Sequence, residues 1–288
     1  MFTVLFPGVL ASAIAATSPA IVPNFGEDGR FQWVGPTGGA SGTAIARRSV
    51  ITAKHVGGST YGVLGNVHTA SYRIHHPTMD LAILVFGQDL PGWHAIGGSA
   101  PVGSEVTWVG YGRTGILNPQ GTGYDIYWWS GGTRLAAPNQ VDLEWYFPGW
   151  GPSLISYLKG NGDAAAVSGD SGGGVFVGDK LVGVISYAFN SSNGVLPDYG
   201  FASLNNGVPY HGSGAISLTD PEVRRWLMDN LVPYCGADFD LSGFVDTDDY
   251  DCFIQAFEAG EDLADFDRSG FVDFEDFTAF VRAFEDGC

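Results

Sequence analysis

Residues 169–173 read Gly-Asp-Ser-Gly-Gly, and this stretch is the strongest indication of the fold. A serine hydroxyl is a weak nucleophile unless a base takes its proton and N–H groups stabilise the resulting oxyanion. Glycines permit a tight turn and leave backbone N–H groups uncovered. The stretch therefore suits Ser171 as a nucleophile, with the amides of Gly169 and Ser171 as an oxyanion hole. A glycine-rich hairpin turn is the alternative, because the chain holds 43 glycines.

Two upstream segments favour the nucleophile. Residues 50–55, Val-Ile-Thr-Ala-Lys-His, end an apolar run on His55, and an apolar run that follows Met79 begins with Asp80. An imidazole exchanges protons near neutral pH and suits a general base, and a carboxylate suits the group that orients it. The order His, Asp, Ser is that of a known nucleophilic triad. Five other histidines compete as the base, at positions 68, 75, 76, 94 and 211.

Together with Gly-Tyr-Gly at residues 110–112, these motifs resemble the trypsin-like (chymotrypsin-fold) serine peptidases over roughly residues 30–232. The resemblance implies a mainly β fold, with two six-stranded antiparallel β-barrels and a C-terminal helix. It also implies a serine endopeptidase that cleaves protein or peptide substrates through an acyl-enzyme. Short β-type runs broken by glycine and proline agree with this fold. Thr219 and Pro221 mark the start of the expected helix.

The same resemblance locates substrate-binding residues. Ala165, six residues before the nucleophile, occupies the position of the pocket floor, and no acid stands there to bind a basic side chain. Ser186, Tyr187 and Ala188 resemble the strand with which a substrate pairs as an added strand. We therefore expect an apolar pocket for a small or medium side chain. In this family the acid before the serine pairs with a new N-terminus, and Ile-Val-Pro at residues 21–23 is the nearest match.

Charge divides the chain in two. Residues 235–288 hold 16 acids and 2 bases, a net charge of −14, whereas residues 1–234 hold 15 acids and 11 bases, a net charge of −4. This break predicts a peptidase domain over residues 17–233 and a second domain over residues 234–288. No basic patch favours nucleic acid, and no segment is long enough to span a membrane.

The acidic tail is an internal repeat. Residues 237–260 and 264–287 align with 15 of 24 positions identical. Calcium takes six to eight oxygen ligands, which a twelve-residue loop supplies at positions 1, 3, 5, 7, 9 and 12, with glycine at position 6. The expected ligands in loop one are Asp238, Asp240, Ser242, the Phe244 carbonyl, Asp246 and Asp249. Those in loop two are Asp265, Asp267, Ser269, the Phe271 carbonyl, Asp273 and Asp276.

Each loop precedes an amphipathic run, and loop one has no room for an entering helix after Cys235. The tail therefore resembles a dockerin-like pair of half EF-hands, a small α-helical calcium-binding module. That resemblance implies two Ca²⁺ sites and a cohesin-like or cell-surface scaffold partner. A solvated acidic tail is the alternative, although a module with this much negative charge is expected to fold poorly without calcium.

Residues 1–16 predict a signal peptide, because a short apolar run leads to Ala-Ile-Ala at residues 13–15. We therefore expect a secreted or cell-surface protein of bacterial type. The cysteines are Cys235, Cys252 and Cys288. Cys235 and Cys288 bracket the tail and are the candidates for a disulfide, and pairing of Cys252 with either stays open at this stage.

Two other functions remain open from the sequence. Residues 169–173 also match the G-x-S-x-G elbow of α/β-hydrolases, whose order is Ser, Asp, His, and Asp198 and His211 supply that order. Only 117 residues follow Ser171, too few for the remaining α/β units of such an esterase. The second alternative is a catalytically silent binding or adhesion protein on a peptidase scaffold, because no usual activation site is present.

Overall fold

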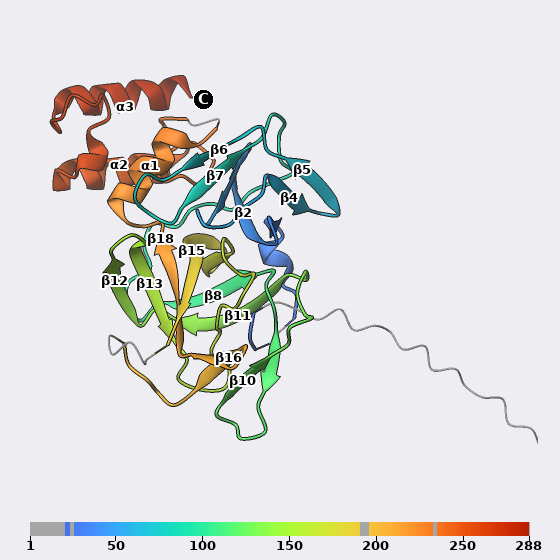
Figure 1. Cartoon of the computed structure of the whole chain (residues 1–288). Helices are drawn as coiled ribbons and strands as arrows, with labels where there is room; N and C mark the ends of the chain where they lie inside the picture. The colour runs from blue at the N-terminus through green and yellow to red at the C-terminus, as the bar shows by residue number, and fades with distance from the viewer. Residues whose placement is uncertain (1–20, 24–25, 191–195, 233–234, 288) are drawn as a thin grey trace, which may run out of the picture.

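The computed structural model describes residues 21–23, 26–190, 196–232 and 235–287, and the predicted signal peptide lies outside them. β-Strands form most of the molecule, and the helices gather toward the C-terminus (Figure 1). A 3₁₀ turn, η1 (Gly29–Phe31), precedes the first strand. The mainly β class expected from the sequence is confirmed.

The first large sheet has the strand order β1-β2-β3-β7-β6. All of its pairings are antiparallel, and the runs predicted from the sequence form its buried centre, β3 and β7. Its strands are β1 (Val34–Thr37), β2 (Ala40–Ala46), β3 (Ser49–Thr52), β6 (Tyr72–His75) and β7 (Ala82–Val85). A hairpin, β4 (Thr60–Val63) with β5 (Asn66–Thr69), stands beside β1.

The second large sheet has the order β11-β8-β14-β15-β18-β13-β12 and lies below the first in Figure 1. Its central strands are largely buried and contain mainly apolar and small residues. Its strands are β8 (Glu105–Gly110), β11 (Leu135–Gln140), β12 (Leu143–Phe147), β13 (Gly151–Tyr157), β14 (Gly174–Val177), β15 (Lys180–Phe189) and β18 (Gly212–Ser217).

A four-stranded sheet, β17-β16-β10-β9, completes the β structure and contains one parallel pairing, β10 with β16. Its strands are β9 (Gly115–Leu117), β10 (Gly123–Ile126), β16 (Ala202–Asn205) and β17 (Val208–Tyr210). Among the described residues no sheet closes on itself, so the expectation of two six-stranded barrels is not confirmed.

Helix α1 (Pro221–Asn230) begins where the sequence predicts a helix. Its N-cap is Asp220 rather than Thr219, because the Asp220 carboxylate accepts hydrogen bonds from the amides of Glu222 and Val223. The tail contributes α2 (Thr247–Ala259), a 3₁₀ turn η3 (Asp262–Ala264) and α3 (Phe274–Asp286). None of the described helices is long and apolar enough to cross a membrane.

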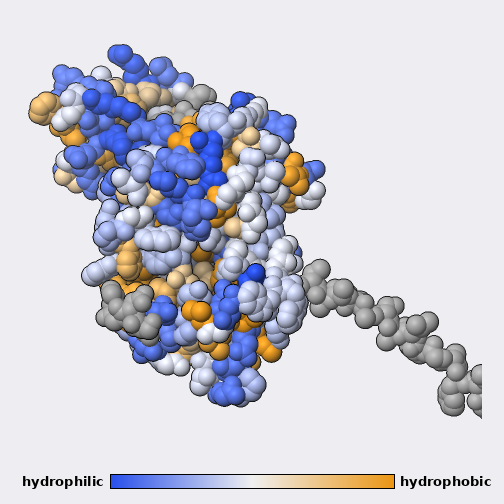
Figure 2. Space-filling view, viewed as in Figure 1, coloured by the Kyte–Doolittle hydropathy of each residue, from blue (hydrophilic) through white to orange (hydrophobic). Residues whose placement is uncertain are grey.

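The tail packs against α1 and the first sheet instead of extending away from them (Figure 1). Phe253 of α2 and Phe280 of α3 stack with ring centroids 4.0 Å apart, within a core that also contains residues of β7 and α1. Its outer surface is largely hydrophilic (Figure 2), as its charge predicts. The shared core indicates that the tail and the β sheets stabilise each other.

A buried arginine joins the two parts. Arg224 of α1 donates hydrogen bonds to the carbonyls of Gly97 (3.3 Å), Phe239 (3.3 Å) and Asp240 (3.0 Å). The Ile96 amide donates to the Leu241 carbonyl in the same region. Loop one of the repeat is therefore attached directly to the strand-rich part. Cys235 is disulfide-bonded and Cys252 is free, while Cys288 lies outside the described residues.

Candidate active site

Pairing of β3 with β7 brings His55 and Asp80 together. Thr52 pairs with Ala82 at the ends of these strands, so the residues just beyond them meet at the same edge of the sheet. His55 exposes 44% of its side chain, whereas the Asp80 side chain is 7% exposed. The apolar runs thus position a solvent-facing base above a buried carboxylate.

Three side chains form a hydrogen-bonded chain. His55 Nδ1 lies 2.8 Å from Asp80 Oδ2, and His55 Nε2 lies 3.0 Å from Ser171 Oγ. An ionised carboxylate only accepts hydrogen bonds, which assigns the imidazole proton to Nδ1 and leaves Nε2 to accept from the Ser171 hydroxyl. This is the arrangement that a general base requires of its nucleophile.

Asp80 is held from three directions. Its Oδ1 accepts from the His55 amide at 3.0 Å, and its Oδ2 also accepts from the Ser186 hydroxyl of β15. The Asp80 amide donates to the Trp150 carbonyl at 3.0 Å. Because Ser186 belongs to β15 and Trp150 to the turn between β12 and β13, the second sheet holds Asp80 in place beside His55.

Glycines shape the turn that carries Ser171. Gly169 and Gly172 have φ of 99° and 85°. A Cβ on Gly172 would lie 2.1 Å from the Ser41 carbonyl oxygen, so a side chain does not fit there. Ser41 of β2 also braces the turn, since its hydroxyl donates to the Gly169 carbonyl and its amide to the Ser171 carbonyl. Within the described residues, the Gly169 and Ser171 amides donate to no protein acceptor and are free for an oxyanion.

The carboxylate beside the nucleophile is wholly buried. Asp170 accepts from the amides of Gly112 and Val167, each at 2.8 Å, and from the amide of Ile21. Burial raises the pKa of Asp170 to about 7 despite these hydrogen bonds. Ile21 is itself fully buried, and its neighbour Val22 forms a bridge with Ala165. The Ile-Val-Pro stretch thus begins next to Asp170.

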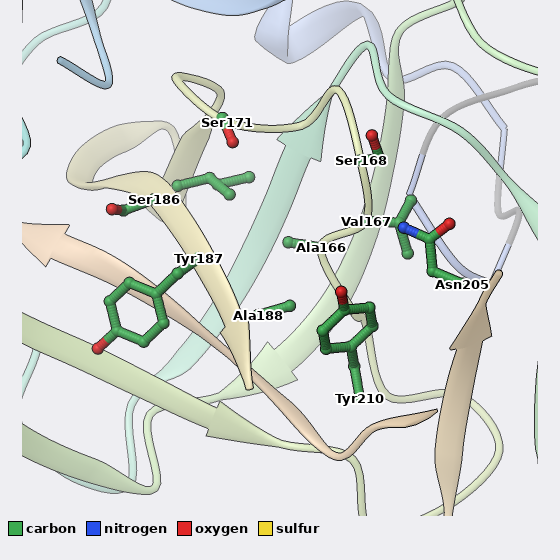
Figure 3. Close-up of a pocket in the computed structure, with 10 residues that line it drawn as sticks. Ala166, Val167, Ser168, Ser171, Ser186, Tyr187, Ala188, Asn205 and Tyr210 are labelled. Atoms are coloured by element: carbon green, nitrogen blue, oxygen red, sulfur yellow. The ribbon is translucent and has the colours of Figure 1, made fainter. Parts of the chain in front are cut away.

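A cavity of about 230 Å³ opens beside Ser171 (Figure 3). No acidic or basic side chain is among its lining residues. They are Ala166, Val167, Ser168, Ser171, Ile185, Ser186, Tyr187, Ala188, Asn205 and Tyr210. The cavity fits an uncharged side chain of modest size, and its polar groups include the Asn205 amide, the Tyr210 hydroxyl and three serine hydroxyls.

The structure brings most of the predicted substrate residues to this cavity. Ser186, Tyr187 and Ala188 line it, but Ala165 does not, because its side chain is buried with Val22 behind the wall. The neighbouring Ala166 lines the cavity instead. Sequence reasoning missed Asn205 and Tyr210, which arrive from β16 and β17. No local motif marks them, and only the tertiary pairing of the four-stranded sheet brings them near.

The alternative pair, Asp198 and His211, makes contacts with each other and not the hydrogen bond to Ser171. His211 Nδ1 is 3.1 Å from Asp198 Oδ1, and the His211 amide donates to the Phe189 carbonyl. The imidazole that contacts Ser171 is that of His55. The hydrogen-bond geometry therefore favours His55 over His211 as the base.

Each repeat of the tail gathers three carboxylates whose nearest oxygen atoms lie within 4.8 Å of one another: Asp238, Asp240 and Asp249 in loop one, and Asp265, Asp267 and Asp276 in loop two. Burial raises the pKa of Asp238 to about 7, and the nearby charges of Asp249 and Asp240 add to this. Asp265 Oδ1 is buried without a hydrogen-bond partner among the described residues. A clustered, partly unsatisfied set of oxygen donors fits a hard divalent cation.

The clustered carboxylates also accept hydrogen bonds from amides of their own loops, and the other predicted ligands have protein partners too. Asp246 and Asp273 are the N-caps of α2 and α3, where they accept from the amides of Asp248 and Glu275. The hydroxyls of Ser242 and Ser269 donate to the carbonyls of the predicted ligands Phe244 and Phe271.

Comparison with known proteins gives only weak structural likenesses. No family model and no curated protein sequence matches the chain. Mouse neuropsin, a serine protease, shares 17% identity at a TM-score of 0.48, covering 69% of this chain and 94% of its own. The active form of the Rv3671c protease of M. tuberculosis shares 18% identity at a TM-score of 0.46, covering 74% and 82%.

Proposed function

We propose that the chain is a secreted serine endopeptidase of the trypsin-like type. The observation that carries this proposal is the hydrogen-bonded chain Asp80–His55–Ser171, with the two free amides beside the nucleophile. Polar residues that only stabilise the fold would be expected to pair these amides, rather than leave them unpaired beside an open cavity. The same features disfavour the silent binding protein.

The proposed reaction uses these groups in order. Ser171 Oγ attacks the peptide carbonyl carbon while its proton moves to His55 Nε2. The amides of Gly169 and Ser171 stabilise the oxyanion of the tetrahedral intermediate. His55 then gives the proton to the leaving amine as the C–N bond breaks, which leaves an acyl-enzyme on Ser171. Water, deprotonated by His55, attacks the ester carbonyl, and His55 returns the proton to Ser171 Oγ as the acyl C–O bond breaks and the carboxylic acid leaves. Asp80 stabilises the imidazolium each time it forms.

The cavity beside Ser171 supports a preference for small or medium uncharged residues before the scissile bond. It lacks the carboxylate that a basic side chain needs and the cation that an acidic one needs. The strand Ser186–Ala188 has β18 on one edge, and its pairing with β14 ends at Val184. The remaining edge suits a substrate that adds as a strand.

We further propose that the tail binds calcium through the two carboxylate clusters. Asp238, Asp240 and Asp249 would hold one ion, and the corresponding residues of loop two the other. The cation would neutralise carboxylates that otherwise repel each other, and so would stabilise the folded tail. A cohesin-like or surface scaffold remains the partner class expected for such a module.

We also propose that cleavage of the chain just before Ile21 controls the peptidase activity. Its amide donates to Asp170, so a chain cut just before Ile21 would place an α-ammonium against a buried carboxylate. That ion pair would lower the pKa of Asp170 and fix the turn that precedes Ser171.

A proteome-derived peptide mixture tests the proposed activity. The full chain and a Ser171→Ala variant are incubated with it in calcium, and cleaved bonds are identified by mass spectrometry. We expect cleavage that requires Ser171 and follows small or medium uncharged residues. Equal products from both chains would contradict the peptidase, and cleavage confined to Lys and Arg would contradict the pocket assignment.

A further inference from the structure

The turn between β12 and β13 contacts the triad from the second sheet. Trp150 lies in this turn, and its carbonyl accepts the hydrogen bond of the Asp80 amide at 3.0 Å. The next residue, Gly151, has φ of 113°, and a Cβ there would lie 2.9 Å from the Met79 side chain. The turn is therefore pressed closely against the segment that carries the triad aspartate.

The Trp150 ring connects the imidazole to the substrate strand. Its centroid lies 6.1 Å from that of His55 in an edge-on arrangement, and 5.3 Å from that of Tyr187. Aromatic pairs at such distances and angles are attractive. Trp150 is nevertheless 39% exposed, so it lies at the surface of the candidate site rather than in the core.

A second cavity of about 230 Å³ lies on the other side of Tyr187 from the first. Phe147, Trp150, Tyr187, Ala188 and Phe189 are among its lining residues, and Tyr187 and Ala188 line both cavities. Figure 3 shows the Tyr187 ring turned away from Ala166 and Tyr210, which face the first cavity. The aromatic walls suit a bulky apolar side chain.

The direction of β15 identifies which part of a substrate reaches this cavity. The first cavity contains Ser186 and the second extends to Phe189, so the second lies farther along β15. Both neighbours of β15 pair antiparallel. A substrate that pairs in the same sense therefore places a residue upstream of the scissile bond in the second cavity.

On the basis of the proposed peptidase activity, we propose that Trp150 is a positioning residue that couples filling of the second cavity to alignment of His55 and Asp80. A bulky apolar side chain in the cavity packs against the Trp150 ring. The ring is thereby held against His55, and the backbone of the same residue holds Asp80. Filling the cavity thus acts on the chemical step as well as on binding.

Paired peptides test this coupling. They share one cleaved bond and carry Phe or Ala at each of the three preceding upstream positions in turn. For wild type we expect Phe at one position to raise kcat/KM about tenfold, mainly through kcat. Trp150→Ala should abolish that preference, and Trp150→Phe should retain most of it. Trp145→Ala is the matched control, because Trp145 is on the same hairpin and its ring contacts Phe147.

The outcomes separate this proposal from the peptidase itself. A wild type that cleaves but shows no upstream preference overturns the coupling, whatever the variants do. A preference confined to KM, or one that survives Trp150→Ala, overturns it as well. Should Trp150→Ala fail to fold, Trp150→Leu replaces it, since an aliphatic side chain lacks the edge-on ring contact with His55. Absence of Ser171-dependent cleavage instead contradicts the peptidase.

Discussion

The Ser186 hydroxyl donates its hydrogen bond to Asp80 Oδ2, the same oxygen atom that faces His55 Nδ1. The two residues are separated by 106 positions, with Ser186 in β15 and Asp80 just before β7. Ser186 also lines the cavity beside the nucleophile. One residue of the proposed substrate strand thus hydrogen-bonds the carboxylate of the proposed triad.

Ser186→Ala should lower kcat about tenfold with little change in KM, because a hydrogen bond to a charged group contributes about 1.5 kcal/mol. Steady-state kinetics on a short peptide measures this. Ser203→Ala is the control, since Ser203 is buried with no partner for its hydroxyl among the described residues. An equal effect of the two substitutions would show that Ser186 acts only through packing.

Asp80→Asn should reduce kcat by about 10³- to 10⁴-fold while the protein remains folded. An amide can donate as well as accept, so it no longer fixes the proton on His55 Nδ1. Asp198→Asn is the matched control, because Asp198 faces His211. If Asp198→Asn proved the more damaging substitution, the assignment of Asp80 would be wrong.

Asp170 should make the intact chain less stable as the pH rises from about 4 to 7. Burial raises its pKa from 3.8 to about 7, so the folded state binds one more proton than the unfolded state in this window. The contribution of Asp170 to the free energy of unfolding is therefore greatest below pH 3.8. It falls by about 1.4 kcal/mol per pH unit until the pH passes the pKa of the folded state.

Urea unfolding of wild type and Asp170→Asn at several pH values measures that slope. In the variant, the free energy of unfolding should lack this part of its pH dependence, because an amide does not titrate. This holds whatever the absolute stability of the variant. Identical slopes in the two proteins would contradict the raised pKa of the buried Asp170 carboxyl group.

Calcium should raise the melting temperature of the whole chain by at least about 5 °C when present at a hundredfold excess over Kd. Loop one should matter more than loop two for the β sheets, because the Leu241 carbonyl accepts from the Ile96 amide in the strand-rich part, whereas the hydrogen bonds of loop two run to Arg225 and Asp229 of α1. Asp238→Asn and Asp265→Asn change equivalent positions of the repeat and form a matched pair.

Differential scanning calorimetry with calcium and with chelator measures these shifts. We expect Asp238→Asn to remove most of the calcium-dependent stabilisation of the β sheets and Asp265→Asn to remove less. A separate low-temperature transition for the tail, with an unchanged main transition, would contradict the shared core.

The three residues of the proposed triad could be predicted from local motifs, because the sequence around each of them is distinctive. An apolar strand that ends near His55, another that begins after Asp80 and a glycine turn at Ser171 are each visible within a few residues. Strand pairing then brings the first two together through Thr52 and Ala82. The mainly β class followed from the same short runs.

Residues that reach the site from distant segments of the chain belong to no recognisable local motif. Ser41 braces the nucleophile turn from β2, and Trp150 reaches Asp80 from the β12–β13 turn. Asn205 and Tyr210 reach the cavity only through the four-stranded sheet. The packing of the tail on α1 was also invisible, because the repeat itself reads as an autonomous calcium module. Tertiary contacts, rather than local preferences, decide all of these positions.

Covalent labelling with a fluorophosphonate tests the triad most directly. The full chain is labelled in calcium beside Ser171→Ala, His55→Ala and His211→Ala, with folding checked by circular dichroism and the labelled residue identified by mass spectrometry. We predict that wild type and His211→Ala carry the label on Ser171 and that the other two variants remain unlabelled. A folded wild type that takes no label, even when the chain begins at Ile21, or labelling that depends on His211 rather than His55, would contradict the account.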